Sequence, residues 1–197
     1  MIALGNDVVD LSLLPRNGQA FYTKLGSYAF SEIERFKLAS YLCTNEGIML
    51  LWSIKEASYK SAMKLGFTNR FKPQDFAIRN VEMNQGFIYS RIEYLSNVFR
   101  GKSVFELNKI HTITIHEDYN FNEVTFSDEW ITSTNYTDQH LAVRNLIVKD
   151  AFFESQGSIS FSKNDSGIPF ILGSGDRLAA EISFSHHGNL VGYGLKM

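Results

Sequence analysis

Apolar and polar residues alternate at the start of the chain. The apolar positions of this alternation are Ile2, Leu4 and Val8. The two-residue period predicts a β-strand over the first ten residues, with Asp7 on the face that carries Gly5. Taken alone, Asp7 is typical of a solvated strand end. Asp10 lies three positions further on and turns to the opposite face, where it could also cap a turn that begins at Leu11.

The next pattern repeats every three to four residues, as helices do. Residues 17–40 predict two helical pieces, and the second opens with Ser31 and Glu34 in the spacing of a capping box. Residues 46–65 predict the most regular helix of the chain. It follows two polar capping candidates and ends at Gly66.

This long helix has two different faces. Its broad apolar or small face consists of Leu50, Leu51, Ile54, Ala57, Ser58, Ser61, Ala62 and Leu65. Its opposite stripe consists of Met49, Trp52, Ser53, Glu56, Lys60 and Met63. The i, i+4 spacing of Glu56 and Lys60 fits a surface ion pair. The Met and Trp residues on the same line indicate instead a partly buried stripe, where a carboxylate and an ammonium are functional candidates.

After Gly66 the chain is rich in predicted strands. Antiparallel strands are predicted at 76–80, 87–94, 104–107, 110–116 and 124–126, with turns at 84–86 and 100–102. A second long helix is predicted at 137–154, with an apolar face of Leu141, Val143, Leu146, Ile147, Ala151 and Phe152. The last strands are predicted at 158–162, 169–172, 181–185 and 190–195, the final two around a turn at 186–189.

This order of elements predicts an α+β fold with two similar halves, each a long helix packed on a small antiparallel sheet. The halves cover about residues 1–130 and 131–197 of one domain. The chain has only 3 Pro and no Gly/Ser-rich linker, so we expect no hinge between independent domains.

Composition narrows the classes of function. The 197 residues are 44% hydrophobic and 20% charged, as in ordinary globular proteins. A formal net charge of −2 provides no global basic field for nucleic acid or an anionic membrane. The single Cys43 excludes a disulfide framework and suits a reducing compartment. With no signal peptide or membrane span in the pattern, we expect a cytoplasmic protein.

Five separated motifs resemble the signature of the 4′-phosphopantetheinyl transferase superfamily. They are Gly5-Asn-Asp-Val-Val-Asp10, Phe30-Ser-Glu-Ile-Glu34, Trp52-Ser-Ile-Lys-Glu-Ala-Ser-Tyr-Lys60, Gly167-Ile-Pro169 and Ser183-Phe-Ser-His186. The Lys-Glu-Ala-x-x-Lys element within a Trp-led helix is the most specific of these. The resemblance extends from the first strand to the last hairpin.

The motif order is that of the short, homotrimeric holo-acyl-carrier-protein synthases. The length approaches that of the longer monomeric transferases, in which two similar halves form a pseudo-dimer. This chain resembles that pseudo-dimer with its halves exchanged. A monomer with the active site within one chain and a homotrimer with the site between chains both remain open.

The resemblance implies transfer of 4′-phosphopantetheine from coenzyme A to a serine of a carrier protein, with release of 3′,5′-adenosine diphosphate. Asp7 and Glu56 would hold Mg²⁺ on the pyrophosphate of the coenzyme, and Glu56 would accept the serine proton. Lys60 would offset charge on the leaving group. Ser185 and His186, where a strand opens into a turn, would contact a phosphate of the coenzyme.

Two departures from the family pattern concern the ligands. The acid at Asp10 has the spacing of the short group, so it is a further but weaker metal-ligand candidate. The Gly-Lys-Pro element of the family has Ile168 at its centre here. Its missing cation could come from Lys64, Lys163 or Arg177.

The remaining histidines receive ordinary assignments. His111, His116 and His140 lack the spacing of metal ligands, and His187 is typical of a turn residue in water. None of the four is assigned to the site.

Two other functions stay open: a non-catalytic relative that binds coenzyme A or a carrier protein, and a Mg²⁺-dependent hydrolase of a nucleotide pyrophosphate. A decayed relative would lose Asp7, Glu56 or Lys60 first, and all three are present. The carrier could serve fatty-acid, polyketide or peptide synthesis. Its docking candidates are the segments 21–22 and 67–71 together with Arg70 and Lys72.

Overall fold

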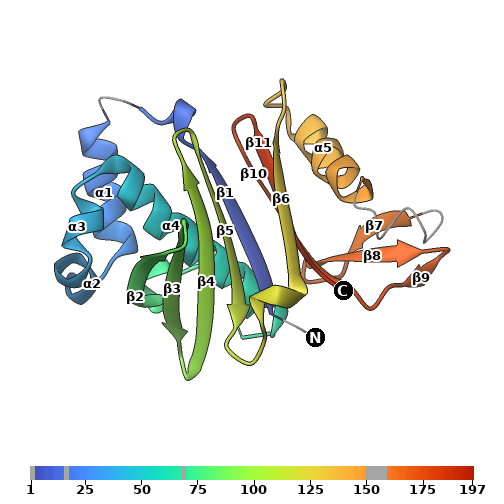
Figure 1. Cartoon of the computed structure of the whole chain (residues 1–197), viewed down its shortest axis with the longest axis horizontal. Helices are drawn as coiled ribbons and strands as arrows, with labels where there is room; N and C mark the ends of the chain where they lie inside the picture. Colours follow the sequence, from blue (N-terminus) through green and yellow to red (C-terminus); the bar gives the residue numbers. More distant parts are fainter. Residues whose placement is uncertain (1–2, 16–17, 68–69, 150–158) are drawn as a thin grey trace.

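The computed structural model describes residues 3–15, 18–67, 70–149 and 159–197. Its largest sheet has five antiparallel strands in the order β1-β5-β4-β3-β2. These strands are β1 (Leu4–Asp10), β2 (Ala77–Asn84), β3 (Phe87–Tyr94), β4 (Asn97–Glu106) and β5 (Lys109–His116). The strand predicted from the alternation is therefore confirmed over Leu4–Asp10, and β1 lies at one edge of this sheet (Figure 1).

Helices cover one face of the five-stranded sheet. The long helix α4 (Asn45–Lys64) crosses β1 and β5, as the periodicity predicts. Three shorter helices follow one another beside it: α1 (Gln19–Ala29), α2 (Glu32–Lys37) and α3 (Ala39–Leu42). The 3₁₀ turns η1 (Leu11–Leu13), η2 (Pro73–Asp75) and η3 (Phe121–Glu123) connect elements around the sheet.

A second sheet stands next to β1. Its antiparallel strands, in the order β10-β11-β6, are β6 (Val124–Trp130), β10 (Glu181–His187) and β11 (Leu190–Lys196). Helix α5 (Tyr136–Val148) packs on this sheet. A small third sheet contains β7 (Ile159–Lys163), β8 (Pro169–Gly173) and β9 (Asp176–Arg177). Strand β6, which begins at Val124, thus pairs with the last hairpin of the chain.

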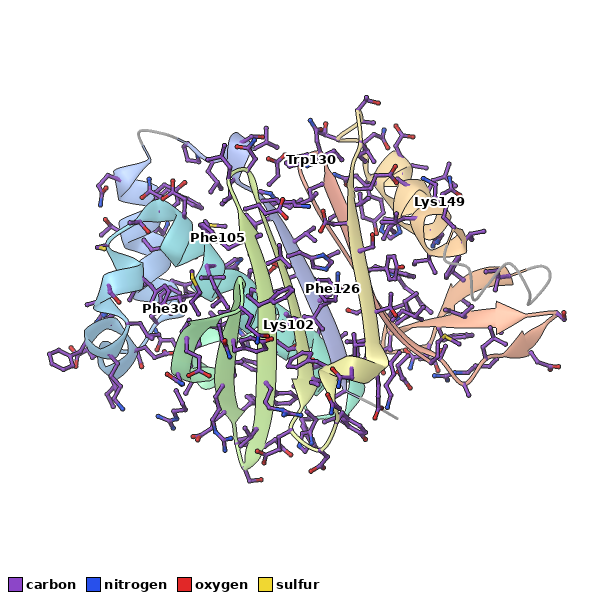
Figure 2. All side chains as sticks on the ribbon, in the orientation of Figure 1. Phe30, Lys102, Phe105, Phe126, Trp130 and Lys149 are labelled. Carbon is purple, nitrogen blue, oxygen red and sulfur yellow. The ribbon has the colours of Figure 1, made fainter. Side chains whose placement is uncertain are left out.

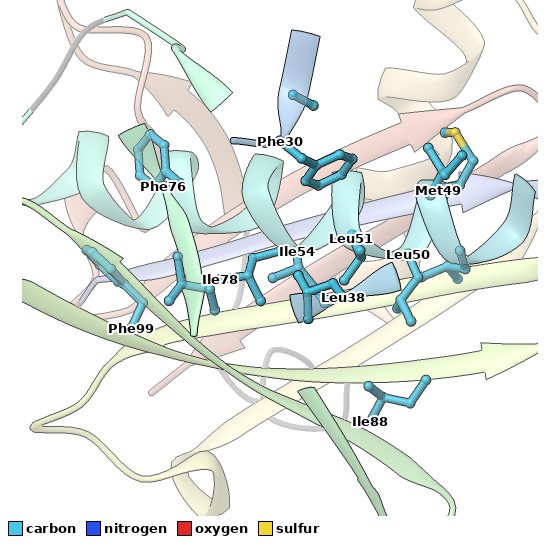
Figure 3. Close-up of a cluster of buried hydrophobic side chains, with 14 of the residues drawn as sticks. Phe30, Leu38, Met49, Leu50, Leu51, Ile54, Phe76, Ile78, Ile88 and Phe99 are labelled. Carbon is cyan, nitrogen blue, oxygen red and sulfur yellow. The ribbon is translucent and has the colours of Figure 1, made fainter. Parts of the chain in front are cut away.

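The core of the larger part lies between α4 and the sheet. Figure 3 shows Leu50 and Ile54 of α4 among Ile78, Ile88 and Phe99 of the strands. All five side chains are buried. The predicted apolar face of the helix is thus confirmed, and burial of this apolar surface is the main stabilising contribution to the helix–sheet contact.

An ion pair lies inside this core. The Nζ of Lys55 is 2.8 Å from Oε1 of Glu34 and donates to the carbonyl of Pro73 at 2.9 Å. The same Glu34 accepts from the backbone N–H of Ile78 and completes the predicted capping box with Ser31. Lys55 thus joins α4 to α2 and to the segment before β2, a structural role for a lysine within the Lys-Glu-Ala element.

The far side of the five-stranded sheet is covered in part by β6. Leu4, Ile113 and Ile115 form a buried cluster there against Phe126 and its neighbours. Lys102 extends its ammonium over the ring of Phe87, 3.9 Å from the centroid, and toward Phe126 (Figure 2). The two sheets therefore share an apolar contact closed by a cation–π interaction.

Several local predictions are wrong. Residues 100–102 form no turn but lie in the middle of β4, where a Cβ on Gly101 would be 2.2 Å from Ser90 Oγ. Close packing explains this glycine. Strand β10 runs on through His187, so the turn comprises Gly188 and Asn189.

The second helix is confirmed over part of its predicted length. Val143 and Ile147 are buried, whereas Leu141 is 57% exposed and does not belong to the core face. The predicted face residues Ala151 and Phe152 lie outside the described residues.

Mixed α+β architecture with antiparallel sheets is confirmed. None of the helices in the described part of the chain combines the length and apolarity needed to cross a bilayer.

Lys55→Met should lower the free energy of unfolding by about 3–5 kcal/mol, because it leaves the buried Glu34 carboxylate without its partner. Urea denaturation measures this change. Lys149→Met is the matched control, since Lys149 pairs with Glu129 on the surface at 3.3 Å and its removal should cost less than about 1 kcal/mol. Equal effects of the two substitutions would contradict the structural role of Lys55.

Candidate functional site

The site begins where α4 touches β1. A Cβ on Gly5 would lie 2.0 Å from the carbonyl oxygen of Ala57 and 2.7 Å from the backbone nitrogen of Ser61. No side chain fits there, so the helix backbone rests directly on the strand. This contact brings Glu56 and Lys60 beside Asp7, which shares the face of Gly5 as predicted.

A cluster of three charged side chains results. The Nζ of Lys60 donates to Oδ1 of Asp7 at 3.1 Å and to the carbonyl of Asn6 at 2.8 Å. The side chains of Asp7 and Lys60 are 7% and 26% exposed. Lys60 thus pairs with Asp7, and the exposed i, i+4 ion pair is not the arrangement observed.

The predicted partial burial of the α4 stripe is confirmed. Met49 and Ser53 are buried, and Trp52, Glu56, Lys60 and Met63 are half-buried. Burial, reinforced by the neighbouring Asp7 carboxylate, raises the pKa of Glu56 to about 8 although Lys60 opposes the shift. When two carboxylates lie close together in a poorly hydrated site, repulsion between their charges favours a state in which one of them is protonated.

A cavity of about 220 Å³ adjoins the charged cluster. Elements α4, α5, β7, β8 and β10, together with Gly167 before β8, supply its lining. The lining residues are Lys60, Met63, Lys64, Tyr136, His140, Lys163, Gly167, Pro169, Ser183, Phe184 and His186. His186 and Lys60, from two motifs that lie far apart in the sequence, therefore line the same cavity.

Three aromatic rings stand together at this cavity. The ring centroids of Tyr136 and His140 are 4.2 Å apart, and His186 lies 5.5 Å from each of them. Tyr136 and His140 occupy neighbouring turns of α5. No site role was predicted for Tyr136 and His140 from the sequence. Their i, i+4 spacing at the start of a predicted helix does indicate that the two side chains are neighbours.

The electrostatics of the cavity favour an anion. Burial and the nearby Lys60 lower the pKa of His186, and burial, His186 and Lys163 lower that of His140. Complete burial lowers the pKa of Lys64 to about 7. The Nζ of Lys64 donates to the carbonyl of Ile182. A bound anion would relieve the repulsion among these groups and raise their proton affinities.

Ser185 does not line the cavity. Because β10 continues through this position, successive side chains point to opposite faces and separate Ser185 from His186. The buried Oγ of Ser185 accepts from Nδ2 of Asn6 at 2.7 Å. The expectation that Ser185 and His186 meet a ligand together is therefore corrected: His186 faces the cavity and Ser185 faces β1.

Asp10 performs the capping role. Its Oδ1 accepts from the N–H and hydroxyl of Ser12, and its Oδ2 accepts from the N–H of Asn189. The Asp10 N–H donates to Nδ1 of His187 at 3.1 Å. Asp10 thus ties β1 to the β10–β11 turn, and we leave it out of the metal site proposed below.

Two of the three candidate cations reach the cavity. Lys64 and Lys163 line it together with Gly167 and Pro169 of the Gly-Ile-Pro element. Arg177 instead stacks on Phe170, with its guanidinium carbon 4.9 Å from the ring centroid.

The carboxylates that could hold a metal ion are the pair Asp7 and Glu56. No group of three or more His, Cys, Asp or Glu side chains that could hold a metal occurs among the described residues. The pair nevertheless fits Mg²⁺, which commonly takes one or two protein carboxylates and completes its shell with water and phosphate oxygens. A divalent cation would also relieve the repulsion that raises the pKa of Glu56.

The predicted docking segments are only partly exposed. Phe21 and Phe67 are accessible, as are Arg70 and Lys72, but Tyr22 is buried. Phe71 packs against the main core. Residues 68–69 of the second segment lie outside the described residues.

No protein-family model matches this chain, and neither does any curated protein. Inference about function therefore rests on the geometry and chemistry of the site.

Gly5→Ala should destabilise the protein by about 1–3 kcal/mol, because the new methyl group overlaps the backbone of α4. Urea denaturation of Gly26→Ala provides the control. Gly26 lies within α1, and its Cβ would meet no atom within 4 Å, so that substitution should stabilise by up to about 1 kcal/mol. Unchanged stability of Gly5→Ala would show that α4 can move off β1 at little cost.

Proposed function

We propose that this chain is a 4′-phosphopantetheinyl transferase. It would move the phosphopantetheine group from coenzyme A to a serine of an acyl or peptidyl carrier protein and release 3′,5′-adenosine diphosphate. The supporting observation is the convergence of Asp7, Glu56 and Lys60 beside a cavity lined by His186 and further cations.

We further propose that the two helix-bearing sheets correspond to the two halves of a pseudo-dimer. The charged cluster consists of residues of the first half, and the adjoining cavity is lined by residues of both halves of one polypeptide. This supports a monomer with its active site within the chain, in preference to a homotrimer with sites between chains.

The cavity is proposed to hold a phosphate-bearing part of the coenzyme. A volume of about 220 Å³ accommodates only a part of so large a molecule. Lys64, Lys163 and His186 would donate to phosphate oxygens, and the Tyr136 and His140 rings provide an apolar wall. Charge-assisted hydrogen bonds to a phosphate are among the stronger polar contacts in proteins.

Asp7 and Glu56 would hold Mg²⁺ at the edge of this cavity. When bound, the ion would neutralise charge on the pyrophosphate. The side chain of Lys60 lies beside the same position and would stabilise the leaving phosphate as its bond to the transferred phosphorus breaks. Asp7 keeps that ammonium in place through the 3.1 Å contact.

Glu56 is the proposed general base. It would accept the proton of the carrier serine as the serine oxygen bonds to phosphorus and the pyrophosphate bond breaks. Burial raises the proton affinity of Glu56, which suits this task once the carboxylate has been deprotonated. Positioning of the two substrates supplies the remaining rate enhancement.

Asp7→Asn and Glu56→Gln should each lower kcat by at least about 100-fold while leaving the fold intact, because each removes an interaction proposed for the transition state. The assay incubates the protein with coenzyme A, Mg²⁺ and an apo carrier protein, and mass spectrometry detects the holo carrier. Glu46→Gln, an exposed position at the start of α4, is the control and should retain full activity.

The same assay separates the alternatives. Release of 3′,5′-adenosine diphosphate without a carrier would identify a pyrophosphate hydrolase. Binding of coenzyme A without turnover would identify a non-catalytic relative. Full transfer in excess chelator would remove Mg²⁺ from the proposal.

Lys64→Met and Lys163→Met should raise the KM for coenzyme A by about 10- to 100-fold, the equivalent of losing one charged hydrogen bond of about 1.5–3 kcal/mol. The KM rises more than kcat falls because phosphate binding is shared by the ground and transition states. Arg177→Met serves as the control and should leave both constants unchanged. An effect of Arg177→Met equal to that of Lys163→Met would contradict the assignment of Lys163, and not Arg177, to the phosphate-binding cavity.

A further inference from the structure

Asn6 makes hydrogen bonds to the two elements that carry Lys60 and His186. It is fully buried between Gly5 and Asp7 on β1. Its carbonyl accepts from the ammonium of Lys60 on α4 at 2.8 Å. Its N–H donates to the Oγ of Ser183 on β10 at 3.1 Å. The backbone of this one residue therefore joins α4 to β10.

The side chain of Asn6 makes a second set of contacts on the opposite face of β1. Its Nδ2 donates to the Oγ of Ser185 at 2.7 Å, and Ser185 immediately precedes His186 of the cavity. The same Nδ2 lies 3.5 Å from Nε2 of the buried His111. The amide is thus directed at both β10 and β5.

His111 is itself held from the second sheet. Its Nδ1 lies 3.1 Å from Oδ1 of Asp128 on β6, whose Oδ2 accepts from Lys109 at 2.6 Å. We assign the ring proton to Nδ1, because a carboxylate accepts there, and this leaves Nε2 to accept from Asn6. A polar chain therefore runs from β6 through His111 to the residue preceding Asp7.

This arrangement includes an unsatisfied group. Among the described residues, none donates a hydrogen bond to the buried Oδ1 of Asn6. An unsatisfied buried acceptor is unfavourable. The Oδ1 of Asn6 therefore does not stabilise the fold, and the value of the amide lies in the two contacts of its Nδ2.

We infer that Asn6 is a positioning residue, supported by His111 and Asp128, which holds Asp7 and Lys60 in register with His186 across the junction of the two sheets. The inference rests on the proposed function, because it concerns the same site. Asn6 acts through Asp7 and Lys60 and is given no contact with substrate.

The test compares Asn6→Leu and Asp128→Asn with a control, Ser103→Ala. Ser103 is fully buried in the same sheet and shares a hydrogen bond with Thr112, but it has no contact with Asn6, Lys60 or Asp128 among the hydrogen bonds of the described residues. The measurements are kcat, the KM for coenzyme A, Mn²⁺ affinity by isothermal titration calorimetry, and stability in urea.

Asn6→Leu should lower kcat at least tenfold with KM changed less than threefold and weaken Mn²⁺ binding at least fivefold, while the variant stays folded in the absence of urea. Asp128→Asn should also lower kcat and weaken Mn²⁺ binding, each by a smaller factor than Asn6→Leu. Ser103→Ala should leave kcat and Mn²⁺ affinity within twofold of the wild type.

Wild-type kcat and Mn²⁺ affinity in both variants would overturn the inference. Should Asn6→Leu fail to fold, Asp128→Asn decides alone, because that change leaves every proposed site residue in place. Absence of transfer by the wild type would refute the proposed function, and the Mn²⁺ affinities would then still decide the role of Asn6. A wild type that neither transfers nor binds Mn²⁺ would refute both.

Discussion

The contact on which the site depends is the one between the backbone of α4 and the backbone of β1 at Gly5. With 2.0 Å between a hypothetical Cβ and the carbonyl of Ala57, only hydrogen fits at this position. Hydroxyl contacts fix the helix on either side: Ser53 donates to Thr112, and Ser61 bonds Thr114 on β5. A helix held so close to a strand leaves little room for water around Glu56, Lys60 and Asp7, and their charges interact strongly for that reason.

The second sheet is joined to β1 mainly by side chains of β10. The N–H groups of Asn6 and Asp10 donate to Ser183 Oγ and His187 Nδ1, not to the backbone of another strand. On β11, Gly192 and Gly194 leave room for Val8 and Ile113 of the first sheet. Hydrogen bonds are directional, so this junction sets the relative position of the sheets more strictly than apolar contact would. The position of His186 relative to Lys60 follows from it.

Sequence patterns were most informative where a single element determines the outcome. The 3.6-residue period located α4, and the spacing of Ser31 and Glu34 identified the capping box. The apolar residues on either side of Glu56 and Lys60 correctly indicated a partly buried stripe, because residues three or four positions apart lie on the same face of a helix. Asp7 and Gly5 were assigned to one face by strand alternation alone.

The errors arose where tertiary contacts decide. Gly101 reads as a turn residue, but Ser90 on the neighbouring strand excludes a side chain there. The pattern His186-His-Gly-Asn reads as a turn, yet β10 runs two residues further, so His186 lies on the opposite face of the strand from Ser185. No burial was predicted for Lys55, and its burial depends on the distant Glu34. None of these partners can be identified from residues near in sequence.

The same tertiary contacts determine how the cavity would respond to a ligand. Lys64 is buried, and its carbonyl partner on Ile182 provides a hydrogen bond but no full negative charge. Its proton is consequently held weakly, as are those of His140 and His186 among their cationic neighbours. A phosphate that enters the cavity adds negative charge to that of the nearby Glu181 and Asp7 and increases the proton affinity of all three groups. Anion binding is therefore coupled to proton uptake, which strengthens the binding of highly charged phosphates as the pH falls through the pKa values of these groups.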